Sequence, residues 1–282
     1  MSGGANEVQA TFWLLDAPTS LVALSESQPD GVGLGTFNPD GTPWVYRKPV
    51  AANRSQTFIA DAHEVRSRTF LAHIRHATAG QPTIENTHPF EQHGRLFAHN
   101  GVVGGLPALR DRLGDHAALV GGSTDSELYF TLMTKRIEEH RGDVIAGITA
   151  AAREIAADIP LYSLNMLLTT ATDVWALRYP DTNELWILER SIAALGGPGG
   201  GFDQRADSGI TRVFSGQLSI LPATINASQP MDTNPLWRLL EPGELIHVDP
   251  GLRVTSTMAV PDPPAEMLVL TAQEAVSQEE AP

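Results

Sequence analysis

Four short segments each place polar or unhindered residues directly after an apolar run, where strand ends commonly carry functional groups. They span residues 29–35, 73–80, 96–103 and 122–127. In the second segment Arg75 and Thr78 leave the same apolar run, and a guanidinium there could bind a carboxylate through two parallel hydrogen bonds. In the third, the amide of Asn100 precedes Gly101, whose N–H is sterically open. Such a pair could donate two hydrogen bonds to one developing oxyanion.

Each segment taken alone also has a purely structural interpretation. The glycines of 29–35 are typical of a tight turn, and they lack the lysine and the helix of a phosphate-binding loop. Asn100-Gly101 is the strongest short signal for a two-residue hairpin. Residues 122–127, which contain Asp125, are typical of an N-capped helix start. The chemistry therefore depends on whether the segments meet in space.

Five histidines crowd the same part of the sequence, at positions 73, 76, 88, 93 and 99. Their spacing matches no closed zinc pattern, and the sequence has no cysteine to complete one. We expect these histidines to hydrogen-bond locally, and we expect neither a metal ion nor another cofactor.

The composition excludes several classes of protein. A chain of 282 residues with 42% hydrophobic content can bury one large core or two modest ones. Its net charge of -14 repels phosphate backbones and anionic lipids, so we expect no nucleic acid or membrane partner. No apolar run approaches the roughly 20 residues that span a bilayer, and the first ten residues lack signal-peptide features, which predicts a cytoplasmic protein. The lack of cysteine removes disulfides and thiol nucleophiles together.

Strands and helices must position the four segments. Residues 123–140 predict a helix that is acidic in its first turn, and a second helix at 143–157 ends before Pro160. Strand-like runs lie before this helical pair at 31–37, 42–46, 69–74 and 95–98, and after it at 164–170, 174–179, 184–188, 218–225 and 244–248. The order predicts an α+β protein with two packed sheets and helices outside. We expect one domain over 1–258, followed by a disordered acidic tail over 259–282.

Taken together, Arg75, Asn100-Gly101 and Asp125, in this order and with these neighbours, resemble the glutaminase domain of class II, N-terminal-nucleophile glutamine amidotransferases. The family motifs are an Arg-aromatic-Ala-Thr strand end, a His-Asn-Gly turn and a Thr-Asp-Ser/Thr-Glu helix start. The likeness is closest to stand-alone bacterial members. It extends through 30–33, 85–90 and 237–245 and covers roughly 10–248. The resemblance implies a four-layer αββα sandwich, with two mostly antiparallel sheets between helical layers.

The resemblance also implies a role for each site residue. Arg75, supported by Thr78, would hold the α-carboxylate of glutamine, and Asp125 would pair with the α-amino group. The side-chain amide of Asn100 and the N–H of Gly101 would form the oxyanion hole.

The family nucleophile is an N-terminal cysteine whose own α-amino group acts as the base, and this sequence has Ser2 after Met1 instead. Serine serves in other N-terminal-nucleophile hydrolases, but residues 2–6 are loop-like and poor strand material. We therefore expect the first strand and its cysteine to lie upstream of Met1. The competing hypothesis is a pseudo-enzyme that binds glutamine or a γ-glutamyl compound without cleaving it.

The function that the resemblance implies is hydrolysis of the glutamine side-chain amide, through a γ-glutamyl enzyme, to glutamate and ammonia. A separate synthetase subunit would use the ammonia, or a related γ-glutamyl amide would be hydrolysed outright. The alternative is a catalytically inactive regulatory or assembly subunit. A third interpretation is an unrelated α+β domain whose matches are only turns and caps, which would leave Arg75, Asn100 and Asp125 far apart.

Overall fold

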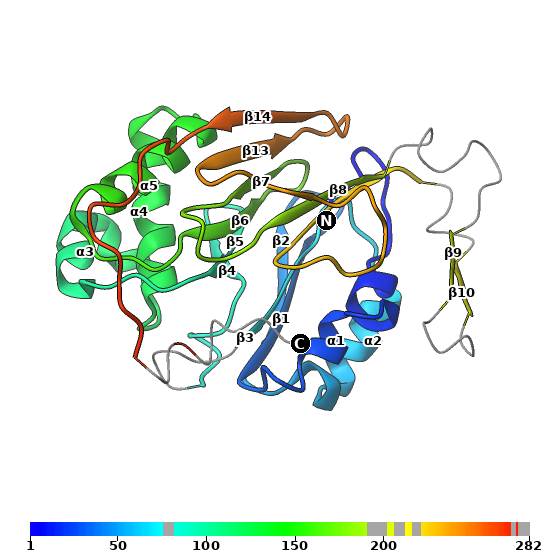
Figure 1. The fold of residues 1–282 in the computed structure, drawn as a ribbon. Coiled ribbons are helices and arrows are strands. Elements are labelled where there is room, and N and C mark those ends of the chain that lie inside the picture. The colour runs from blue at the N-terminus through cyan, green and yellow to red at the C-terminus, as the bar shows by residue number, and fades with distance from the viewer. Residues whose placement is uncertain (76–81, 191–201, 206–211, 216–220, 272–274, 276–282) are drawn as a thin grey trace.

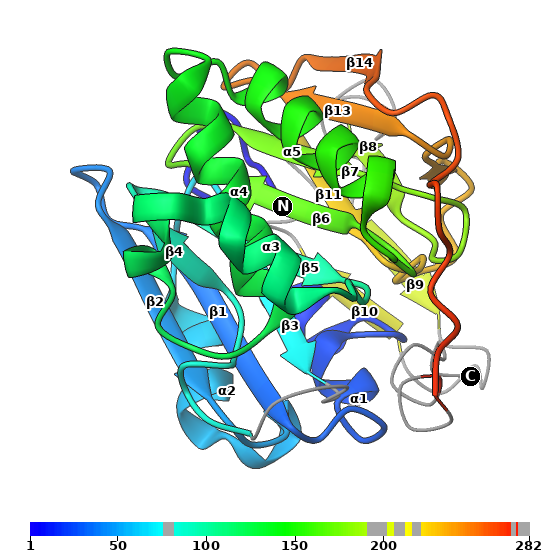
Figure 2. The same ribbon diagram turned by 90° about the vertical axis from the view of Figure 1, so that its left-hand side faces the viewer.

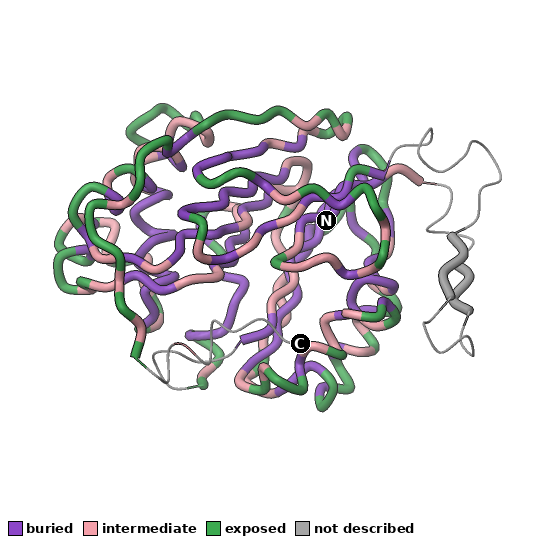
Figure 3. The backbone as a smooth tube through the Cα atoms, in the orientation of Figure 1, coloured by how far each residue is buried: buried purple, intermediate pink, exposed green. Residues whose placement is uncertain are grey.

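A computed structural model of the protein describes residues 1–75, 82–190, 202–205, 212–215, 221–271 and 275. Two sheets lie face to face between two groups of helices (Figures 1 and 2). The burial pattern follows these layers, because the strands at the centre are mostly buried and the outer turns are exposed (Figure 3). The predicted αββα sandwich is confirmed.

The larger sheet has six antiparallel strands in the order β14-β13-β7-β6-β5-β4. The strands are β4 (Phe90–Gln92), β5 (Arg95–Asn100), β6 (Asn165–Thr169), β7 (Val174–Leu177), β13 (Glu244–Val248) and β14 (Val254–Met258). On its outer face lie α3 (Leu106–Leu113), the 3-10 helix η3 (Gly114–Leu119), α4 (Asp125–Glu139) and α5 (Val144–Asp158) (Figure 2). Aromatic and aliphatic side chains fill this layer, and the ring of Phe97 stacks on that of Phe130 with centroids 4.7 Å apart.

Helix α4 begins where the capping chemistry predicts. The hydroxyl of Thr124 accepts a hydrogen bond from the N–H of Glu127, and the first turn is acidic. Its buried face packs on α5 and on the sheet. The helix ends at Glu139, with His140 as its C-cap, before Arg141 and Gly142, which both have a positive φ. This start places Asp125 beside the end of β5.

The second sheet consists of two three-stranded parts. One has the order β2-β1-β3, formed by β1 (Gly31–Phe37), β2 (Pro43–Lys48) and β3 (Leu71–Arg75); the other has the order β11-β8-β12, formed by β8 (Trp186–Arg190), β11 (Ala223–Ala227) and β12 (Arg238–Leu239). Its covering elements are the π-helical turn η1 (Phe12–Asp16), α1 (Leu21–Leu24), the 3-10 helix η2 (Ala52–Arg54) and α2 (Gln56–Glu64). A short hairpin is formed by β9 (Phe202–Arg205) and β10 (Arg212–Ser215).

The first two residues join these two parts. Ser2 pairs with Thr69 on one side and with Thr224 on the other, and the backbone N–H and C=O of Ser2 both bond to Thr224 at 2.8 Å. The Met1 amine donates to the carbonyl oxygen of Phe70 at 2.9 Å. Met1 and Ser2 therefore occupy a strand position between the ends of β3 and β11.

Some predicted boundaries differ from the structure. Residues 56–64 form the helix α2, which the strand-rich interpretation of this region did not include. The strand predicted at 218–225 lies at Ala223–Ala227, and residues 218–220 fall outside the described residues.

The expected tail also differs, because residues 259–268 are bound to the fold. The N–H groups of Ala265 and Leu268 donate to Ala156 and Leu161, and the Arg153 guanidinium donates to the carbonyl of Ala259. Backbone hydrogen bonds fix a segment whose composition has little apolar area to bury. Residues 272–274 and 276–282 lie outside the described residues. In the described parts of the chain, no helix is long and apolar enough to cross a membrane.

Candidate functional site

Arg75 ends β3 opposite Gly31, the first residue of β1. The side chain is buried, with 5% of its surface exposed. Burial lowers the pKa of the Arg75 guanidinium, while the carboxylates of Asp30 and Asp125 act in the opposite direction. The end of β3 and the start of α4 thus lie close enough for the charges of Arg75 and Asp125 to interact.

The glycines of 29–35 serve close packing inside a strand. A Cβ atom on Gly33 would lie 1.9 Å from the carbonyl oxygen of His88, and one on Gly31 would lie 3.1 Å from a methyl group of Thr87. The tight-turn interpretation is therefore wrong for 31–35, which are part of β1. The glycines let the segment around His88 pass directly over the strand next to Arg75.

Asp125 is the first residue of α4 and is also buried, with 7% of its surface exposed. Its Oδ2 accepts a hydrogen bond from the backbone N–H of Val103 at 2.8 Å. Val103 lies just beyond the Asn100-Gly101 pair, so this bond joins the helix start to the loop that leaves β5. The N-cap interpretation of 122–127 is correct, and the same cap positions a buried carboxylate.

Asn100 is the last residue of β5 and pairs with Asn165 of β6. The hydroxyl of Ser163 donates to its backbone carbonyl at 3.0 Å, and the amide of Asn183 donates to its side-chain oxygen at 3.4 Å. Since the Asn100 carboxamide oxygen accepts from Asn183, its NH2 group points in another direction and can donate to a ligand.

Gly101 is required by a close backbone approach. A Cβ atom at this position would lie 2.1 Å from the carbonyl oxygen of Ser163. Gly101 is absent from the described residues with positive φ, and β5 is followed by α3 rather than by a strand. The hairpin interpretation of Asn100-Gly101 is therefore wrong, and the pair forms a strand end.

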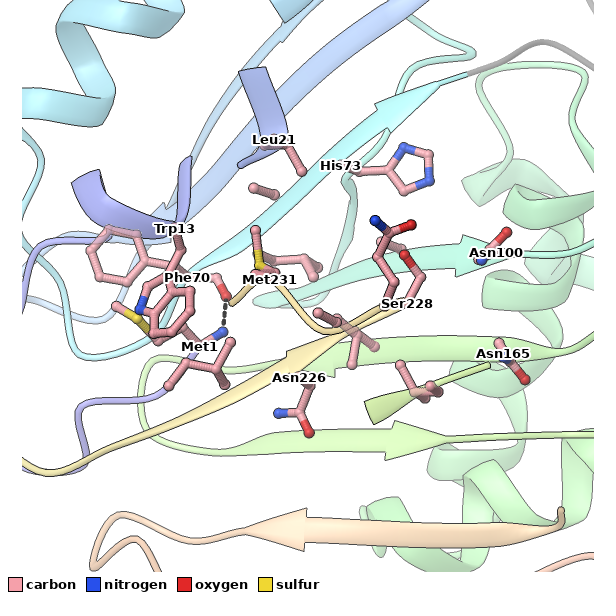
Figure 4. A pocket seen from close by; sticks show the side chains of 18 of the residues that line it. Met1, Trp13, Leu21, Phe70, His73, Asn100, Asn165, Asn226, Ser228 and Met231 are labelled. Atoms are coloured by element: carbon pink, nitrogen blue, oxygen red, sulfur yellow. Dashed lines mark hydrogen bonds between the residues drawn. The ribbon is translucent and has the colours of Figure 1, made fainter. Parts of the chain in front are cut away.

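A cavity of about 150 Å³ runs between the two sheets from Met1 to Asn100 (Figure 4). Its walls are largely apolar and include 70–73, at and before β3, and 225–229, at and after β11. Asn100 and His99 line it, whereas Arg75 and Asp125 are not among its described lining residues. The cavity therefore meets the polar group at the end of β5.

Ser2 does not fit the role of a nucleophile. It is fully buried between two strands, its hydroxyl accepts from the N–H of Gly4 at 3.1 Å, and it is not a lining residue of the cavity. Met1 does line the cavity, and burial lowers the pKa of its amine from 8.0 to about 5.

Two of the five clustered histidines, His88 and His99, are buried beside the site, and His73 is half-buried. The rings of His73 and His88 lie 4.2 Å apart, and His73 points into the cavity (Figure 4). Burial lowers the pKa of His73 to about 4 and that of His88 well below its ordinary value, so both rings are neutral near pH 7. No group of three or more His, Asp or Glu side chains in the described residues is arranged to hold a metal ion.

Sequence reasoning missed the polar groups that support the site. The Glu127 carboxylate accepts the N–H groups of Gly121 and Gly122, and Asn86 accepts the N–H of Ser123 at 2.9 Å. The spacing of Thr124 and Glu127 matches a capping box, which predicts a bond from the Thr124 N–H to Glu127 and therefore did not indicate the contacts with the two glycines. Thr78, predicted to support the carboxylate site, lies outside the described residues.

Comparisons with known proteins identify the family to which the chain is similar. A family model described as "Glutamine amidotransferases class-II" matches residues 18–271. A Haemophilus influenzae protein described as "Putative glutamine amidotransferase" is 27% identical over 84% of this chain and 79% of its own length. The Escherichia coli protein "Putative glutamine amidotransferase YafJ" is 30% identical over 76% of this chain and 80% of its own length.

The fold is shared with a solved structure. A glutamine aminotransferase class-II domain protein from Silicibacter pomeroyi superposes with a TM-score of 0.56 at 20% identity, covering 82% of this chain and 92% of that one. The match over 18–271, together with the paired sheets and the predicted motifs, leads to one conclusion: this chain belongs to the class II glutamine amidotransferases.

Proposed function

We propose that the chain binds L-glutamine, or a related γ-glutamyl amide, between Arg75, Asp125 and the Asn100-Gly101 pair. The observation that carries this proposal is the buried pairing of opposite charges, in which Arg75 lies within electrostatic range of Asp125. An amino acid carries one negative and one positive group on the same carbon atom. A guanidinium and a carboxylate close to each other therefore fit it and fix the direction of its side chain.

The donors at the end of β5 would act on the side-chain amide of the ligand. The NH2 group of Asn100 and the N–H of Gly101 would both donate to the carbonyl oxygen as it gains negative charge. One such donor contributes roughly 3 kcal/mol to the stabilisation of a tetrahedral state. The support for this role is the fixed backbone at Gly101, where the Ser163 carbonyl leaves no room for a side chain.

Hydrolysis also requires a nucleophile, and the cavity indicates where it would enter. Ser2 pairs with both neighbouring strands, so β3 and β11 are separated by the width of one strand. Beyond Met1, the space between β3 and β11 is the cavity, and the cavity extends to Asn100. We propose that a form of the protein with an extended strand ahead of Met1, beginning with a nucleophile, hydrolyses the amide through a γ-glutamyl enzyme to glutamate and ammonia.

The fate of the ammonia follows from this chemistry. A separate ammonia-using synthetase subunit would take it, or the substrate would be another γ-glutamyl amide that is simply hydrolysed. The lack of cysteine in all 282 residues favours a second candidate, in which this chain binds glutamine without cleaving it and acts as a regulatory or assembly subunit.

Two measurements test these proposals. Calorimetric titration with L-glutamine is expected to show binding to the chain and none to Arg75→Ala, while Arg95→Ala, at the opposite end of β5, is expected to retain it. Equal binding by Arg75→Ala would overturn the site. Ammonia release is then compared between this chain and a form that carries a strand with a terminal cysteine ahead of Met1. Release from the extended form alone supports hydrolysis, and release from neither supports the binding-only candidate.

A further inference from the structure

The side chain of His99 joins the two elements that carry the site. His99 lies in β5 directly before Asn100, and it is 3% exposed. Its Nε2 lies 2.9 Å from the carbonyl oxygen of Ser163, and its Nδ1 lies 3.0 Å from the hydroxyl of Ser126 in the first turn of α4. The His99 ring therefore connects three segments, which are the end of β5 next to Asn100, the loop at Ser163, and the start of α4 at Asp125.

The partners of His99 determine where its hydrogen lies. A carbonyl oxygen only accepts, so Nε2 must carry the hydrogen. Burial lowers the pKa of His99, although Asp125 acts in the opposite direction, and the neutral ring leaves Nδ1 as an acceptor. The single hydrogen of the Ser126 hydroxyl is therefore donated to His99.

This hydrogen bond leaves the Asp125 carboxylate able to bind a ligand. The Ser126 hydroxyl is 3.4 Å from Oδ1 of Asp125, farther than from His99, so that oxygen is only weakly engaged by it. Oδ2 is held by the N–H of Val103 at 2.8 Å. One carboxylate oxygen is thus fixed to the protein, and the other can accept from a cation.

The start of α4 is consequently tied to the β5 loop at two points. His99 holds Ser126 just before the Asn100-Gly101 pair, and Val103 holds Asp125 just after it. We propose that His99 and Ser126 are positioning residues that aim Asp125 at the α-ammonium group and so select ligands that carry one. This inference rests on the proposed function and deepens it, because it names the part of the ligand that these residues distinguish.

The test compares two ligands that differ only in the α-amino group, L-glutamine and glutaramate, by calorimetric titration. In the unchanged chain L-glutamine is expected to bind at least tenfold more tightly. In Ser126→Ala the affinity for L-glutamine is expected to fall about tenfold and that for glutaramate to stay within about twofold, since only the contact with Asp125 is disturbed. Ser126→Thr keeps the hydroxyl and is expected to retain the preference.

Ser123→Ala is the matched control, because it removes a hydroxyl of the same loop that bonds to Asn86 and not to His99. It is expected to leave the preference unchanged. If Ser126→Ala does not fold, His99→Phe breaks the same link from the strand side and is expected to lower the preference in the same way. A variant that keeps the full preference, or that weakens both ligands equally, would overturn the positioning role. An unchanged chain with no preference for L-glutamine would instead contradict the proposed function.

Discussion

The two ends of the cavity differ in how their chain segments are held together. At the Asn100 end, the side chains of Ser163, Asn183 and His99 form hydrogen bonds that join the end of β5 to the loops before β6 and β8. At the Met1 end the walls are apolar, and the two halves of the sheet are connected through residues 1–2. The Asn100 end therefore carries the polar groups that could recognise a ligand, whereas the Met1 end is an apolar space between two strands.

This difference separates binding from reaction. Residues at the Asn100 end are expected to determine glutamine affinity, and residues at the Met1 end are expected to determine stability and the approach of a nucleophile. Substitutions at the two ends should therefore change different measured quantities.

After the loss of binding expected for Arg75→Ala, the largest expected effect is that of Asp125→Asn. The substitution keeps the size of the side chain and removes the charge that pairs with the α-ammonium group, so L-glutamine affinity should fall roughly a hundredfold, about 3 kcal/mol. The affinity for glutaramate should change far less. Titration calorimetry with both ligands measures this, and equal losses for both would show that Asp125 does not contact the amino group.

The half-buried His73 at the cavity gives a pH dependence. The folded-state pKa of His73 is lowered from 6.5 to about 4 by burial, so between these values the unfolded chain binds more protons. Stability is therefore fully present above pH 6.5 and decreases as the pH falls toward 4, by up to about 3 kcal/mol. Denaturant unfolding between pH 7 and 4 should show a smaller decrease for His73→Phe. An identical slope in both proteins would contradict the assignment.

Gly101→Ala tests the close approach at the strand end. The added methyl group would meet the Ser163 carbonyl at 2.1 Å, so the free energy of unfolding should fall by about 1–3 kcal/mol and L-glutamine affinity should weaken about tenfold. Gly121→Ala is the matched control, since its Cβ would be 3.7 Å from the nearest atom, a Glu127 oxygen. The same thermal unfolding temperature for both variants would show that the backbone at Gly101 and Ser163 accommodates a methyl group without loss of stability.

The smallest expected effect on binding is that of Met231→Ala at the apolar wall. The loss of buried contacts should destabilise the protein by about 2 kcal/mol, while L-glutamine affinity stays within about twofold. A large loss of affinity would show that the ligand extends into the apolar part of the cavity.

The sequence predicted the elements that have strong local signals. The cap at Thr124, the acidic first turn of α4 and the apolar patterns of strands β5 to β7 and β13 all lie within short windows. They indicated an α+β protein with two packed sheets, and the four-layer sandwich was expected from the family resemblance. The helix α2 was missed, although Ser55 caps it by accepting from the N–H of Phe58, because its apolar positions are few. Local patterns also misassigned Asn100-Gly101, since the turn signal is overridden by the contact with Ser163.

The supporting contacts of the site could not be predicted, because they join residues far apart in the chain. The bond between His99 and Ser163 spans 64 positions, and that between Met1 and Phe70 spans 69. The residues around His99 in the sequence do not indicate that its partners are Ser126 and Ser163. The family resemblance supplied the expected roles of Arg75 and Asp125, and the fold supplied their proximity.

The most direct test of the account is a crystal structure of this chain with L-glutamine. The expected result is one bound molecule whose α-carboxylate contacts Arg75, whose α-ammonium group contacts Asp125, and whose side-chain oxygen lies between the Asn100 amide and the Gly101 N–H. Glutamine bound elsewhere, or with its side chain directed away from the end of β5, would contradict it.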